Sequence, residues 1–259
     1  MIGHVLAAIT RDISPAMASC ELTHLPRTPI DLDRARAQHR DYERALAEAG
    51  CRVERLPAGP DMPDAVFVED IAIVLDELAI ITRPGAESRR VEVPALAAAL
   101  EPHRRLRFIA APGTVDGGDV CQIGEHFLIG VSHRTNESGA RQLQRRLAAM
   151  GYGSELVDIR HHPELLHLKS GLSWLDGETV AATRSIAGHA ALARYRALVP
   201  ESREAYAANC VRVNDDVLFA AGYPKLEAEL KHLGLRPCVL EMSEFRKMDG
   251  GLSCLSLRF

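Results

Sequence analysis

The stretch that decides the fold is residues 66–82, VFVEDIAIVLDELAIIT, in which two apolar runs flank the polar pair Asp76-Glu77. Apolar runs of this length favour strands, and a short polar turn between them predicts a β-hairpin. The pattern returns at 117–131 (GGDVCQIGEHFLIGV), 171–183 (GLSWLDGETVAAT) and 209–222 (NCVRVNDDVLFAAG). Their turns contain Gly124, Gly177 and Asn214, residue types that tolerate positive φ. The chain therefore predicts four hairpins of one design.

Helical patterns and further strands lie between these hairpins. Apolar residues recur at helical spacing in 32–50, 138–151 and 226–234, and each of these segments ends at a glycine. Short strand candidates lie at 51–56, 106–111, 153–159 and 237–242. The repeating unit is thus a hairpin, a connection and one more strand.

A fifth unit is split between the two ends of the sequence. Residues 4–10 (HVLAAIT) and 251–259 (GLSCLSLRF) both have the composition of strands, and their pairing would complete the set. Repeated supersecondary units predict a closed radial array, and pairing of the ends removes exposed sheet edges. We expect one α/β domain over residues 1–259. The alternative is an ordinary α/β sandwich in which the spacing is coincidental.

Composition excludes several classes of partner. The 31 Lys and Arg against 35 Asp and Glu give a net charge of −4, so we expect neither nucleic-acid nor membrane binding. No apolar run approaches the roughly 20 residues that cross a bilayer, and the first residues lack the features of a secretory signal. The six irregularly spaced cysteines have no zinc-finger pattern, so we expect free thiols in a cytoplasmic protein.

Three kinds of residue could form a catalytic set. Cys254 lies in an apolar strand after Asp249-Gly250-Gly251, and His167 precedes the third hairpin. A similar Asp-Gly-Gly string at 116–119 offers either Asp116 or Asp119. A radial array would bring these equivalent positions together near its axis. A cysteine, a histidine and an aspartate then supply a nucleophile, an acid/base and an orienting group. Taken singly, each residue has a structural alternative: core filler for the cysteine, a buried structural role for the histidine, and a turn or cap for the aspartate.

Charged residues at strand ends suggest what such a site would bind. Asp64, Glu69 and Asp70 gather beside the first hairpin, and a cationic group would compensate their burial. Strand ends are also where guanidinium forks commonly bind carboxylates. The candidates are Arg83, Arg89 and Arg90 after one strand and Arg134 after the next outer strand. The alternatives are helix or turn caps for the acids and solvated charges for the arginines. Together the two groups favour a substrate with a cationic end and a carboxylate end, such as an arginine-like amino acid.

At these residues the sequence resembles the dimethylarginine dimethylaminohydrolases of the guanidino-group-modifying (pentein) superfamily. The matching strings extend over nearly the whole chain: FVEDIAI, ITRPGAESRR, APGTVDGGDV, RTNESGARQL, LHLKSGLSWL, EAYAANCVRVN, AGYPK and RKMDGGLSCLSLRF. The resemblance implies a five-bladed α/β propeller with the active site at its centre. It also implies hydrolysis of Nω-methylated arginines to citrulline and an amine.

The resemblance assigns roles to particular residues. It makes Cys254 the nucleophile, His167 the acid/base and Asp116 the carboxylate hydrogen-bonded to that histidine. It also implies a set of substrate-binding residues: Leu22 in a lid, Asp64, Glu69 and Asp70 around the amine and guanidinium, Arg89 and Arg134 at the α-carboxylate, and Met248 and Asp249 in the wall. It implies no cofactor and no required metal, although zinc could inhibit by binding Cys254 and His167.

Two other functions fit the same residues. An arginine deiminase would act on unmethylated arginine, but its relatives are longer chains with an inserted helical domain that this sequence does not show. A non-catalytic arginine-binding propeller is the second alternative, and the complete set of Cys254, His167 and Asp116 argues against it. The sequence leaves open whether the protein is a monomer or a homodimer.

Overall fold

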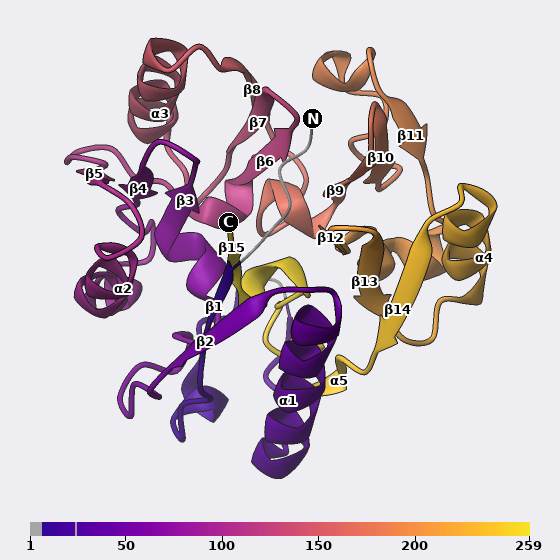
Figure 1. The fold of residues 1–259 in the computed structure, drawn as a ribbon, viewed down its shortest axis with the longest axis horizontal. Coiled ribbons are helices and arrows are strands. Elements are labelled where there is room, and N and C mark those ends of the chain that lie inside the picture. Colours follow the sequence, from indigo (N-terminus) through magenta and orange to yellow (C-terminus); the bar gives the residue numbers. More distant parts are fainter. Residues whose placement is uncertain (1–6, 24) are drawn as a thin grey trace.

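The computed structural model describes residues 7–23 and 25–259, in which five three-stranded sheets surround a common centre (Figure 1). From the innermost strand outward, the sheets are β15 (Leu257–Arg258), β1 (Ala7–Arg11) and β2 (Arg52–Leu56); β3 (Ala72–Val74), β4 (Ala79–Ile81) and β5 (Leu106–Phe108); β6 (Val120–Ile123), β7 (His126–Val131) and β8 (Gly153–Asp158); β9 (Leu172–Asp176), β10 (Thr179–Ala182) and β11 (Arg196–Leu198); and β12 (Val211–Val213), β13 (Asp216–Ala220) and β14 (Arg236–Leu240).

Every sheet has the same internal design. The middle strand runs antiparallel to the inner strand and parallel to the outer strand. The four predicted hairpins are confirmed as β3–β4, β6–β7, β9–β10 and β12–β13. Gly124 and Asn214 adopt φ values of 60° and 53° in their turns, as the residue types predicted.

The two ends of the chain close the ring. Strands β15 and β1 pair antiparallel, with Ala8 opposite Arg258 and Ile9 opposite Leu257. Residues 4–6 of the predicted first strand lie outside the described residues. The fifth unit is therefore confirmed, and the fold is a five-bladed α/β propeller rather than a two-layer sandwich.

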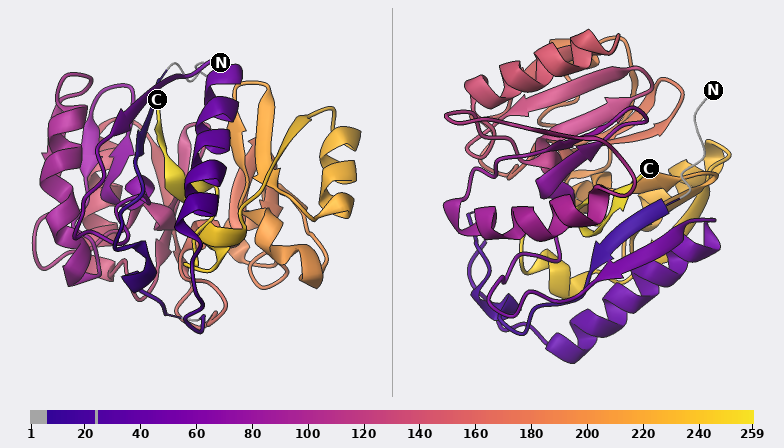
Figure 2. Two further views of the ribbon diagram at one scale, coloured as in Figure 1. Left: turned by 90° about the horizontal axis from the view of Figure 1, so that it is seen from below. Right: turned by 60° about the vertical axis from the view of Figure 1, so that its left-hand side comes forward.

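Helices cover the outside of the ring (Figures 1 and 2). The predicted helices are α1 (Leu32–Glu48), α3 (Glu137–Ala149) and α4 (Pro224–His232), and the side chains of Asp31 and Asn136 cap the first two. Helix α2 (Val93–Leu100), with proline in its first turn, joins β4 to β5 and was not recognised in the sequence. A short helix, α5 (Ser243–Arg246), leads from β14 toward the last strand.

Apolar side chains fill the space between the sheets and the helices. Tyr42 and Leu46 on α1 are fully buried in a cluster that includes residues of β12 and β13. The hydroxyl of Tyr42 and that of Ser256 form a hydrogen bond of 2.6 Å. On α3, Leu143 and Leu147 are fully buried and pack with the strands of two adjacent blades. The hydrophobic core is therefore peripheral, between the blades and their helices, which leaves the centre of the ring to polar side chains.

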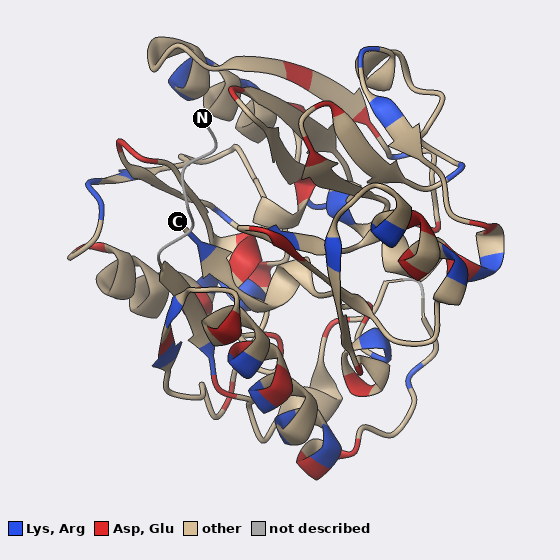
Figure 3. Cartoon of the chain, turned by 45° about the vertical axis from the view of Figure 1, so that its right-hand side comes forward, with Lys and Arg blue, Asp and Glu red and all other residues tan. Residues whose placement is uncertain are grey.

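Charge is mixed over the surface. Acidic and basic segments are interspersed along the chain, for example on α1, where ion pairs such as Arg44 with Asp41 join residues one turn apart (Figure 3). Among the described residues, no helix combines the length and the hydropathy that crossing a bilayer requires.

Candidate active site

Each inner strand is preceded by a short 3₁₀ turn that leads into the centre of the ring. These lead-in turns are Val68–Ile71, Gly117–Asp119, Leu168–Ser170, Ser202–Ala208 and Ser253–Leu255. Turns of neighbouring blades contact one another because the inner strands converge. Four of the five turns carry or directly follow the predicted chemical groups: Asp70, Asp116, His167 and Cys254.

His167 and two carboxylates form the buried centre of the site. The imidazole Nε2 lies 3.0 Å from Oδ2 of Asp116, which is the hydrogen bond that the resemblance implied. The same nitrogen lies 3.9 Å from Oδ1 of Asp70. The other oxygen of Asp116 accepts the backbone N–H of Gly85 at 2.8 Å. Asp116 is thus fixed at both oxygens, and it fixes the ring of His167.

Glycine is required at the second position of the Asp-Gly-Gly string. A Cβ atom on Gly118 would lie 2.7 Å from Nδ1 of His167 and 2.9 Å from Oδ1 of Asp70. The backbone N–H of Gly118 instead donates to that Asp70 oxygen at 3.0 Å. Because Gly118 has no side chain, His167 and Asp70 can both approach its backbone closely.

The same three residues bring ligand-type atoms together. The Asp70, Asp116 and His167 donors lie within 4.8 Å of one another, and this group does not include Cys254. The expectation that zinc could inhibit through Cys254 and His167 stays a prediction.

Burial and charge set unusual protonation states. Burial lowers the pKa of His167, but Asp70, Asp116 and Asp119 outweigh that effect and raise it to about 9. Burial also raises the pKa of Asp70, yet His167 and Arg89 bring it down to about 2. For Cys254, burial and the carboxylates of Glu69 and Asp70 act together and raise the thiol pKa to about 12. Near neutral pH the site thus holds an imidazolium, a carboxylate and a protonated thiol.

A small charged cavity opens onto these groups. Its lining includes most of the predicted site residues together with several new ones: Glu21, Asp64, Phe67, Asp70, Arg89, Asp116, Arg134, Leu166, His167, Met248, Asp249, Gly250 and Cys254. Within the wall, Asp249 adopts a left-handed φ of 59°, and Met248 is buried. The sequence had placed Asp249 and Gly250 beside the nucleophile, whereas nothing in it marked Phe67 or Leu166.

The segment after η1 (Met17–Ser19) closes one side of this cavity. Glu21 lines it, and its backbone N–H donates to Oδ2 of Asp64 at 3.0 Å. Arg134 also lines the cavity, and its guanidinium donates to the hydroxyl of Thr23 at 3.3 Å. Leu22, predicted to be in a lid, lies between Glu21 and Thr23 in the sequence, but its side chain packs against the main hydrophobic core. Glu21 was not predicted from the sequence, although it directly precedes Leu22, the predicted lid residue.

The two predicted carboxylate-binding arginines differ in their surroundings. Arg134 is half-buried, and its guanidinium contacts Thr23. Arg89 is 6% exposed, and its guanidinium donates to Asp70, to both oxygens of Glu92 and to the Phe67 carbonyl. Most donors of Arg89 are therefore used within the protein, where they compensate the charge of buried carboxylates.

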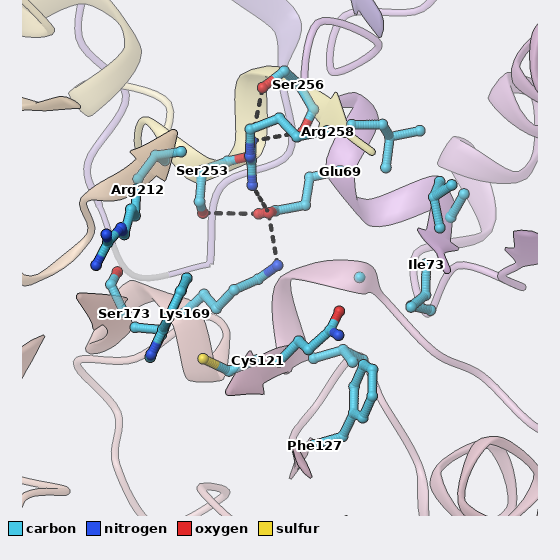
Figure 4. Close-up of a pocket in the computed structure, with 18 of the residues that line it drawn as sticks. Glu69, Ile73, Cys121, Phe127, Lys169, Ser173, Arg212, Ser253, Ser256 and Arg258 are labelled. Atoms are coloured by element: carbon cyan, nitrogen blue, oxygen red, sulfur yellow. Dashed lines mark hydrogen bonds and ion pairs between the residues drawn. The ribbon is translucent and has the colours of Figure 1, made fainter. Parts of the chain in front are cut away.

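Glu69 points away from the charged cavity. Its carboxylate accepts Lys169 Nζ at 2.6 Å, Ser253 Oγ at 2.8 Å and Arg258 Nη2 at 3.2 Å, as Figure 4 shows. It lines a second pocket of about 180 Å³, with a mixed polar and apolar lining, on the other side of the lead-in turns. The reason is local geometry: Glu69 and Asp70 are adjacent in one turn, so their side chains point in different directions.

Comparison with known proteins gives a consistent assignment. The sequence model described as "Arginine deiminase" matches residues 59–218. The "N(G),N(G)-dimethylarginine dimethylaminohydrolase" of Pseudomonas aeruginosa is 37% identical over 100% of both chains. The protein of the same name from Streptomyces coelicolor is 35% identical over 97% of this chain and 96% of its own.

Solved structures agree with the sequence comparison. The P. aeruginosa enzyme, as a cysteine-to-serine mutant complexed with citrulline, superimposes with a TM-score of 0.95 at 36% identity, covering 99% of this chain and 100% of that one. The N-terminal domain of a cyanobacterial arginine dihydrolase has the same fold, with a TM-score of 0.85 at 18% identity over 98% of this chain and 97% of its own. With its five blades, its buried His167–Asp116 pair and its full-length relatives, the chain belongs to the dimethylarginine dimethylaminohydrolase family.

Proposed function

We propose that the protein hydrolyses Nω,Nω-dimethyl-L-arginine to L-citrulline and dimethylamine, and Nω-methyl-L-arginine to L-citrulline and methylamine. The observation that carries the proposal is the shared cavity of Cys254, the His167–Asp116 pair and Asp70. These residues supply a nucleophile, an acid/base and an anion for a guanidinium. The full-length relatives named dimethylarginine dimethylaminohydrolases support this substrate class.

We assign the charged groups of the substrate to different residues of the cavity wall. Asp70 and Asp64 receive the cationic groups, because both are buried carboxylates in its wall. Arg134 binds the α-carboxylate, and Arg89 assists mainly by neutralising Asp70. Leu22, Met248 and Asp249 complete the lid and wall.

The remaining predicted residue, Glu69, acts from behind this wall and not by contact with the substrate, because its carboxylate is bonded to Lys169, Ser253 and Arg258.

The reaction begins with a thiol that the substrate itself activates. The guanidinium brings a positive charge beside Cys254 and lowers its pKa, so the thiol loses its proton to solvent. The thiolate attacks the central guanidinium carbon, and a C–S bond forms in a tetrahedral adduct. His167, already an imidazolium, transfers its proton to the methylated nitrogen. The C–N bond breaks, the amine leaves, and a thiouronium stays on Cys254.

Hydrolysis of this intermediate restores the enzyme. His167 is now neutral and takes a proton from water as the hydroxide attacks the thiouronium carbon. The second adduct breaks its C–S bond, forms the carbonyl of citrulline with loss of the hydroxyl proton, and returns Cys254 as a thiolate. A larger, mainly apolar cavity also borders Cys254. The proposed chemistry uses no cofactor.

The cellular location belongs to the same proposal. The six cysteines are irregularly spaced and form no zinc-finger pattern, which supports the expected reducing, cytoplasmic environment.

A substrate panel tests the activity directly. We expect citrulline from dimethylarginine and methylarginine and almost none from arginine, because the relatives share the first activity. Cys254→Ser should lower turnover by more than about 1000-fold with an unchanged thermal midpoint, since the nucleophile is lost and the fold is not. Equal or faster release of ammonia from arginine would reassign the protein as a deiminase.

Arginine 134 should control affinity and not chemistry. We expect Arg134→Gln to raise KM about 10- to 100-fold with little change in kcat, because a charge-assisted hydrogen bond to the α-carboxylate is lost. Arg90→Gln in the neighbouring loop, where the guanidinium pairs with Glu87, is the matched control. If both variants have the wild-type KM, Arg134 is not the carboxylate ligand.

The free thiol should react slowly near neutral pH. Because its pKa is raised to about 12, alkylation of Cys254 by iodoacetamide in the substrate-free enzyme should increase about tenfold per pH unit between pH 7 and 10, without a plateau. Mass spectrometry of the Cys254 peptide measures the rate, and Cys254→Ser gives the background. A plateau near pH 8 would show that the free enzyme already holds a thiolate.

A further inference from the structure

Four lead-in turns supply the groups assigned to catalysis, and the fifth has no assigned role. The turn Ser202–Ala208 precedes β12 and ends at Asn209. Asn209 is 5% exposed, although it carries a polar side chain. In the blade formed by β12, β13 and β14, Asn209 therefore has the position that the catalytic groups have in the other four blades.

The amide of Asn209 joins the turns that carry the nucleophile and the acid/base. Its Oδ1 accepts the backbone N–H of Ser253 at 3.1 Å. Its Nδ2 donates to Ser253 Oγ at 3.0 Å and to the backbone carbonyl of Lys169 at 2.8 Å. Ser253 directly precedes Cys254, and Lys169 is two residues after His167. The amide therefore spans the two residues whose relative position the reaction needs.

Glu69 closes this connection into a circuit. Its carboxylate accepts a hydrogen bond from Lys169 Nζ on one oxygen and from Ser253 Oγ on the other, and Figure 4 shows both bonds. Asn209, Lys169, Glu69 and Ser253 thus form a closed ring of hydrogen bonds across four blades. A closed ring restrains each member more strongly than a single bond would.

The backbone nearby is shaped to admit this amide. A Cβ atom on Gly251 would lie 2.4 Å from Asn209 Oδ1, so the second glycine before the nucleophile makes room for it. The partners also define the amide's orientation, because a backbone N–H faces Oδ1 and a backbone carbonyl faces Nδ2. An aspartate would have the right shape but would present an oxygen to the carbonyl of Lys169.

We propose that Asn209 is a positioning residue that holds Cys254 in register with His167 through Ser253 and Lys169. It touches neither substrate nor the reacting atoms in this assignment. Its loss should therefore slow the chemical steps without weakening substrate binding. The inference rests on the proposed function, because it is measured through dimethylarginine turnover.

The experiment compares Asn209→Ala, Asn209→Asp and Ser253→Ala with the wild type. We expect kcat for dimethylarginine to decrease about 10- to 100-fold, because small displacements of reacting groups have effects of this size. KM should stay within about threefold, and alkylation of Cys254 at pH 10 should be unchanged. The double variant Asn209→Ala/Ser253→Ala should lose less than the product of the single losses, because both substitutions break one circuit.

Ser173→Ala is the matched control. Ser173 is equally buried, and its hydroxyl accepts the backbone N–H of Cys210, next to Asn209, but it has no bond to Ser253 or Lys169. This variant should lose stability and keep its kcat. A wild-type kcat in both Asn209 variants, or an equal loss in Ser173→Ala, would overturn the proposal.

Ser253→Ala retains the test if the Asn209 variants do not fold, and a wild-type kcat in that variant would likewise overturn the proposal. An inactive wild type would instead contradict the proposed function.

Discussion

The burial of a protonated histidine between carboxylates is the interaction on which this site depends. The pKa of His167 is raised because Asp70 lies 3.9 Å away, Asp116 is hydrogen-bonded to the ring, and Asp119 adds a further negative charge. Burial, together with the carboxylates of Glu69 and Asp70, raises the pKa of the Cys254 thiol and keeps it protonated in the free enzyme. The acid for the leaving amine is therefore present before the substrate binds, whereas the nucleophile forms only when a cationic substrate arrives. Selectivity for a guanidinium follows from this electrostatic arrangement.

The propeller makes such a cluster possible. Five inner strands converge, so five lead-in turns can place polar side chains at one point while the apolar core stays between the blades and their helices. Neighbouring residues of one turn face opposite sides of the wall, as Asp70 and Glu69 do. The front side carries the chemistry. On the other side, hydrogen bonds with Glu69 and Asn209 hold Ser253 and therefore the turn that leads into β15.

The sequence was sufficient to predict the repeated hairpins, but not which buried side chains pair with one another. The hairpins and the closure by the chain ends follow from short apolar runs and turn residues, and the two Asp-Gly-Gly strings located Asp116 and Cys254. The partners of Glu69 could not be predicted, because Ser253, Lys169 and Arg258 come from separate segments that packing brings together. The pairing of Arg89 with Asp70 likewise joins separate segments, whereas its partner Glu92 lies three residues away in the same turn. Asn209 gave no signal either, since an asparagine before a strand commonly serves as a turn residue.

The central claim is that Cys254 carries a covalent intermediate after the amine has left. Rapid acid quenching during turnover, followed by mass spectrometry of the Cys254 peptide, tests it most directly. Dimethylarginine and methylarginine should give the same mass increase on this peptide, because the group that distinguishes them has departed. Increases that differ by one methyl group, or an adduct on another residue, would contradict the account.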